Sequence, residues 1–106
     1  MMGEACRSFI RLIRAGEYYE AHEALEEVWF PRRFEKNDEI RLIKGFINAS
    51  VAFELAKRNR MEPARKTWSV YLKYRPLLNE IESGHVALYR EIERTLEKTH
   101  EQLFGP

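Results

Sequence analysis

The segment at residues 38–58 limits the fold more than any other part of the chain, because at helical spacing it is apolar on two faces. One face carries Ile40, Ile43, Ile47 and Val51, and the other carries Leu42, Phe46, Ala49, Phe53 and Ala56. A surface helix needs only one apolar stripe, whereas a helix with two must be covered on two sides. We therefore expect this segment to form a central helix that is packed against other helices on both sides.

Four further segments repeat apolar side chains at helical spacing, and no run of the sequence alternates like a half-buried strand. Residues that end helices separate these segments: Gly16, Pro31, Asn59, Pro76 and Gly84. The sequence thus predicts an all-α fold, a compact array of five helices that forms a single helical domain over residues 1–106.

Composition narrows the classes of function and compartment. Lys and Arg number 18 and Asp and Glu 17, so net charge gives no general attraction to nucleic acid or to anionic membranes. We expect no membrane segment, since no run approaches about 18 apolar residues. Cys6 is the only cysteine, which favours a reducing, cytoplasmic setting. Charged residues make up 33% of the chain, a composition that favours a thermophilic source.

The second helical segment, at residues 18–30, carries the most suggestive polar residues. Tyr18, Leu25 and Trp29 form its apolar stripe, and His22 lies at the margin of that stripe one turn before Glu26. A histidine beside a carboxylate can bind a metal or transfer a proton near neutral pH. Glu23 and its neighbouring glutamates Glu20 and Glu27 are expected to point toward solvent.

Two interpretations of this segment stay open. In the first, His22 and Glu26 are metal or acid–base residues, joined by Glu23 or by Glu54 of the central helix as further catalytic candidates. The sequence His22-Glu23-Ala24-Leu25-Glu26 lacks the second histidine of the zinc-peptidase motif. In the second, His22 and Glu26 form a structural pair, and Glu54 pairs with Arg58, Lys57 or solvent.

These residues also resemble a known family. The resemblance rests on Gly16-Glu17-Tyr18-Tyr19-Glu20-Ala21-His22-Glu23, followed by Leu25-Glu26 and Trp29, and then on Gly45-Phe46-Ile47-Asn48-Ala49. Over residues 5–75 the chain resembles the small prokaryotic helical proteins called domain of unknown function 309. The resemblance implies a five-helix array without an established activity, and motif positions at Tyr18, His22, Glu23, Glu26, Trp29 and Asn48. The chain departs from the family at Asn48, usually glutamine, and at Phe53-Glu54, frequently Tyr-His.

A basic stripe on the first helix suggests a third function. Arg7, Arg11 and Arg14 share the face opposite its apolar residues and are candidates for contacting nucleic acid. The near-neutral net charge and the lack of a DNA-binding motif argue against this function. The leading expectation is a non-enzymatic module that binds a protein partner or another copy of itself, without a cofactor. The alternatives are a hydrolase centred on His22 and Glu26 and a nucleic-acid-binding protein.

Overall fold

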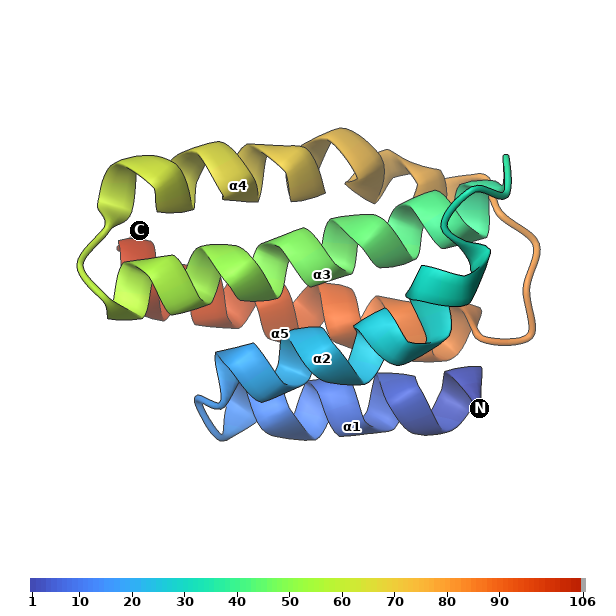
Figure 1. Cartoon of the computed structure of the whole chain (residues 1–106), viewed down its shortest axis with the longest axis horizontal. Helices are drawn as coiled ribbons and strands as arrows, with labels where there is room; N and C mark the ends of the chain where they lie inside the picture. The colour runs from blue at the N-terminus through green and yellow to red at the C-terminus, as the bar shows by residue number, and fades with distance from the viewer. Residues whose placement is uncertain (106) are drawn as a thin grey trace.

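Helix α3 (Asp38–Lys57) runs through the middle of the molecule and is packed on both sides, as its two apolar faces predict (Figure 1). The structure is a computed structural model, and it describes residues 1–105. Helix α4 covers one side of α3, while α2 and α5 cover the other. All predicted residues of the two faces are buried except Val51, which is half-buried at the edge of α2.

The remaining elements confirm the all-α prediction, with five α-helices and no strand within residues 1–105. Around α3 lie α1 (Met2–Arg14), α2 (Tyr18–Trp29), α4 (Met61–Tyr74) and α5 (Val86–Phe104). Two 3-10 turns, η1 (Phe30–Arg32) and η2 (Arg75–Asn79), complete the chain. Helices α1, α3 and α5 run in one direction and α2 and α4 in the other (Figure 1). No helix in this part of the chain is long and apolar enough to cross a membrane.

The predicted helix ends are found with their expected chemistry. Gly16 has φ 76° after α1, and Asn59 has φ 61° after α3, both in the left-handed region that these residues tolerate. The Asn37 side chain caps α3 by accepting hydrogen bonds from the amides of Glu39 and Ile40. Helix α2 ends at Trp29 rather than Phe30, because the chain tightens into η1 at Pro31.

An aromatic cluster joins the helices that flank α3. The Phe53 ring lies 5.5 Å from Tyr18 of α2 and 5.5 Å from Trp68 of α4. Trp68 in turn stacks on His100 of α5, with ring centroids 4.2 Å apart. Trp68 and Tyr71 are therefore core residues, as expected for aromatic side chains at helical spacing.

Cys6 is fully buried on the inner face of α1. Burial raises the pKa of its thiol to about 12, which keeps the side chain protonated near neutral pH. This placement makes Cys6 a core residue rather than an exposed, reactive thiol.

Candidate functional site

Two motif residues of α2, Tyr18 and His22, meet α3 at a small pocket of about 180 Å³. It is lined by Tyr18, Tyr19, His22, Val51, Glu54, Leu55, Arg58 and Arg60. The antiparallel packing of α2 and α3 brings His22 and Glu54 to the same pocket, although no ion pair within 4 Å joins them. A pocket of this volume is smaller than the roughly 300–1,000 Å³ of typical small-molecule sites and fits a single side chain.

His22 pairs with Glu26 across one turn of α2. The Nε2 atom of His22 lies 2.9 Å from Oε2 of Glu26. The other ring nitrogen, Nδ1, is buried and has no hydrogen-bond partner. One ring nitrogen is thus engaged by Glu26, and the other is buried without a partner within residues 1–105.

Glu54 is half-buried and has its own partner. Its Oε2 accepts a hydrogen bond of 2.8 Å from Nε of Arg58, one turn further along α3. Burial and the nearby Glu54 charge raise the pKa of the Tyr18 hydroxyl, which keeps that hydroxyl protonated. No serine, threonine or cysteine lines the pocket to act as a nucleophile.

The other motif residues lie away from this pocket. Glu23 is exposed on the outer face of α2, and Trp29 is half-buried, with its ring 6.4 Å from that of Phe30. The Asn48 side chain donates a hydrogen bond to the carbonyl of Lys44. Within residues 1–105 no group of three or more His, Cys, Asp or Glu side chains is arranged to hold a metal ion. The pair His22 and Glu26 alone supplies fewer protein ligands than a catalytic zinc site uses.

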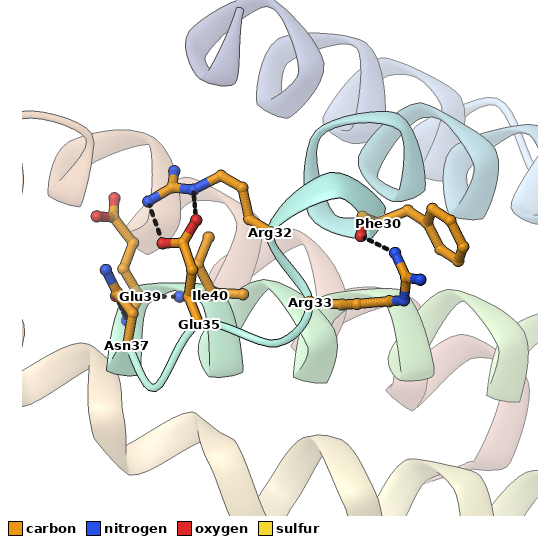
Figure 2. A network of polar contacts seen from close by, with 7 residues as sticks. All are labelled: Phe30, Arg32, Arg33, Glu35, Asn37, Glu39 and Ile40. Atoms are coloured by element: carbon orange, nitrogen blue, oxygen red, sulfur yellow. Dashed lines mark hydrogen bonds and ion pairs between the residues drawn. The ribbon is translucent and has the colours of Figure 1, made fainter.

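The corner between α2 and α3 is built around arginines (Figure 2). Arg32 donates two hydrogen bonds of 3.0 Å to the carboxylate of Glu35. Arg33 donates to the carbonyl of Phe30 at 2.6 Å, and its guanidinium carbon lies 3.6 Å from the centre of the Phe30 ring and 4.5 Å from that of Phe34. These contacts hold two phenylalanines on the surface, with 51% of Phe30 and 85% of Phe34 exposed.

Two shallow hollows are lined by residues of α2, one beside this corner and the other between α2 and the start of α1. The first, of about 570 Å³, is lined by Glu23, Ala24, Glu26, Glu27, Phe30 and Pro31. The second, of about 440 Å³, is lined by Met1, Glu4, Ala5, Ser8, Ala24, Glu27 and Val28. They share Ala24 and Glu27, so together they form one surface, which Phe30 and Phe34 extend on either side of Arg33; we call the whole the α2–η1 face. Within residues 1–105, four glutamates and no cationic side chain line the two hollows.

Sequence reasoning missed the exposed aromatics of this face. In the sequence, Pro31 indicates only where a helix ends. Two phenylalanines next to two arginines, at the ends of a polar linker, are a sequence signal that could have identified it.

The predicted arginine stripe of α1 lines neither the pocket of His22 nor the hollows of the α2–η1 face. Arg7, Arg11 and Arg14 line a groove of about 350 Å³ between α1 and α5, together with Leu88 and Glu91. Glu91 pairs with Arg14 at 3.3 Å. The stripe is therefore interrupted by a carboxylate from α5, which no inspection of α1 alone could reveal.

Comparison with protein families gives one match, and it agrees with the resemblance of the motif. The family model described as Domain of unknown function (DUF309) matches residues 6–67, which includes α2, α3 and the corner between them. Comparison with curated proteins and with solved structures gives no match.

Proposed function

We propose that this chain, which belongs to the domain of unknown function 309 family, is a protein-interaction module that binds through its α2–η1 face. The observation that carries the proposal is the exposure of Phe30 and Phe34 around Arg33 in a corner fixed by hydrogen bonds. Aromatic residues and arginine are enriched where protein interfaces gain most of their binding free energy.

Hydrogen bonds within the chain link the residues of the corner. Arg32 and Glu35 close it from one side, and the cap at Asn37 fixes the start of α3 directly after it. A surface that is held in one conformation loses little entropy on binding, so more of the contact energy appears as affinity.

The charge of the face selects the partner. Glu4, Glu23, Glu26 and Glu27 surround the two hollows, and Phe30 supplies an apolar wall. The complementary surface is a basic amphipathic segment of another protein, with apolar side chains for the hollows and Lys or Arg for the glutamates. We assign this chemistry to the partner.

Two short amphipathic peptides with the same leucine pattern test the proposal, one carrying lysine and the other glutamate at the polar positions. Fluorescence anisotropy is expected to show binding of the lysine peptide alone. The double variant Phe30→Ser, Phe34→Ser should weaken that binding by about tenfold or more, as loss of interface anchors does. The matched control is Leu72→Ser, which removes an exposed apolar side chain from α4.

Two results would contradict the proposal. Equal binding by wild type and the double variant would show that the peptide does not use the aromatic corner. A dimer in sedimentation equilibrium that is lost in the double variant would show that a second copy of the chain, rather than a basic segment, occupies the face.

The pocket between α2 and α3 supports a second candidate function, an acid–base enzyme that uses His22. The observation in its favour is the buried Nδ1 without a partner, since native proteins seldom leave such an atom unpaired. Turnover of simple ester or phosphoester substrates that His22→Ala abolishes and Glu23→Ala leaves intact would establish it. No turnover by the wild-type protein would exclude it for those substrates.

A further inference from the structure

A further concave surface, separate from the α2–η1 face, is lined by residues from the C-terminal end of α1 and from the second half of α5. Its volume is about 490 Å³, within the range of small-molecule sites. Within residues 1–105, three cationic side chains line it, Arg14, Arg94 and Lys98, and no carboxylate does. The chain as a whole has 18 basic and 17 acidic residues, so it is nearly neutral. The positive charge of this cavity is therefore a local feature.

Two of these cations have no ion-pair partner in the part of the chain that the structure describes. Arg94 and Lys98 are four residues apart on α5, so they are neighbours on the helix surface and repel each other. No carboxylate lies within 4 Å of either side chain in residues 1–105, whereas Arg14 is paired with Glu91. An anion placed between Arg94 and Lys98 would relieve their repulsion.

A fourth cation approaches from the central helix. Nζ of Lys57 donates a hydrogen bond of 3.2 Å to the carbonyl of Gly16, which itself lines the cavity. Thr95 and Thr99 also line it, but their hydroxyls already donate to backbone carbonyls. Attraction for a ligand therefore comes from the cations and from the amide of Gln102.

We propose that this cavity binds a small molecule that carries phosphate groups. Arginine presents a planar set of donors that matches phosphate oxygens, and lysine adds a point charge. A compact anion fits better than a long polyanion, because Arg14, which the cavity shares with the groove of Arg7 and Arg11, is already paired with Glu91. The proposal is independent of the protein-interaction function.

Inorganic pyrophosphate serves as the probe, and calorimetric titration of the whole chain at low salt measures its binding. The wild type should bind it, and the double variant Arg94→Gln, Lys98→Gln should bind at least about tenfold more weakly. The double variant Arg65→Gln, Lys66→Gln is the matched control, since it removes the same charge from exposed positions on α4. Its affinity for pyrophosphate should equal that of the wild type.

Three outcomes would overturn the proposal. The first is the absence of pyrophosphate binding to the wild type. The second is equal weakening by both double variants, which would indicate diffuse attraction rather than a site. The third is that the wild type binds a single-stranded oligothymidylate but not pyrophosphate, and that the double variant Arg7→Gln, Arg11→Gln no longer binds the oligothymidylate. This result would assign the basic surface to nucleic acid.

Discussion

The hydroxyl of Tyr89 donates a hydrogen bond to Oε2 of Glu39 and so ties the first half of α5 to the start of α3. Ser83 donates to the same oxygen at 2.6 Å, and Nδ1 of His85 lies 4.0 Å from it. The half-buried carboxylate of Glu39 therefore links both the loop before α5 and α5 itself to the start of α3. The residues are more than 40 positions apart in sequence, so only the fold reveals the cluster.

Tyr89→Phe should lower the free energy of unfolding by about 1.5–3 kcal/mol, because it removes a hydrogen bond to a charged group. Tyr71→Phe is the matched control, since the Tyr71 hydroxyl is also buried but has no partner. Its removal should leave stability unchanged or raise it. Urea unfolding of both variants measures the difference, and equal losses would show that the bond to Glu39 does not contribute.

Stability should fall at alkaline pH. Burial raises the pKa of Cys6 to about 12 and raises the pKa values of Tyr71 and Tyr89 above their usual range. The unfolded chain therefore loses these protons first, and the stability present below about pH 8.5 declines as pH rises.

The expected decline is about 1.4 kcal/mol per pH unit from Cys6 alone, and it steepens above about pH 10 as the tyrosines contribute. Denaturant unfolding from pH 7 upward measures it. Cys6→Ala should remove the decline between about pH 8.5 and 10. An unchanged slope in that variant would contradict the assignment to the thiol.

His22→Phe should leave the stability unchanged or increase it. The pair with Glu26 is partly exposed and is worth about 1 kcal/mol or less, whereas burying the unpartnered Nδ1 costs about 1–3 kcal/mol. Glu26→Gln serves as the control for loss of the pair alone. A loss above about 2 kcal/mol in thermal or urea unfolding would indicate that the imidazole has a stabilising partner.

Asn37→Ala should cost about 1 kcal/mol, because the amides of Glu39 and Ile40 lose their cap. Asn37→Asp retains a side-chain oxygen that can accept these bonds, so it should stay within a few tenths of the wild type. Unfolding experiments on both variants make the comparison. If Asp is as harmful as Ala, the cap is not the source of the effect.

The fold could be predicted because its signals are local. The two apolar faces of α3, the left-handed Asn59 and the break at Pro31 each depend on residues near one another in sequence. Helical periodicity reports burial directly, and the structure buries the apolar residues of α2 and α3 that it identified, except Val51 and Trp29, which are half-buried.

The candidate sites could be predicted only in part. The pair of His22 with Glu26 follows from spacing within one helix, and it is found. Two other juxtapositions depend on how helices distant in sequence pack together. Arg94 and Lys98 line the same cavity as Arg14, and Tyr89 donates to Glu39. Spacing along one helix contains no information about such contacts.

A titration of the isotopically labelled protein with the lysine peptide, followed by backbone amide shifts, tests the central claim most directly. The account predicts that the largest shifts fall on the α2–η1 face, at residues 23–34 and at the start of α1. Shifts concentrated instead on α4, or at the pocket of His22 and Glu54, would contradict the assignment of this face as the interaction surface.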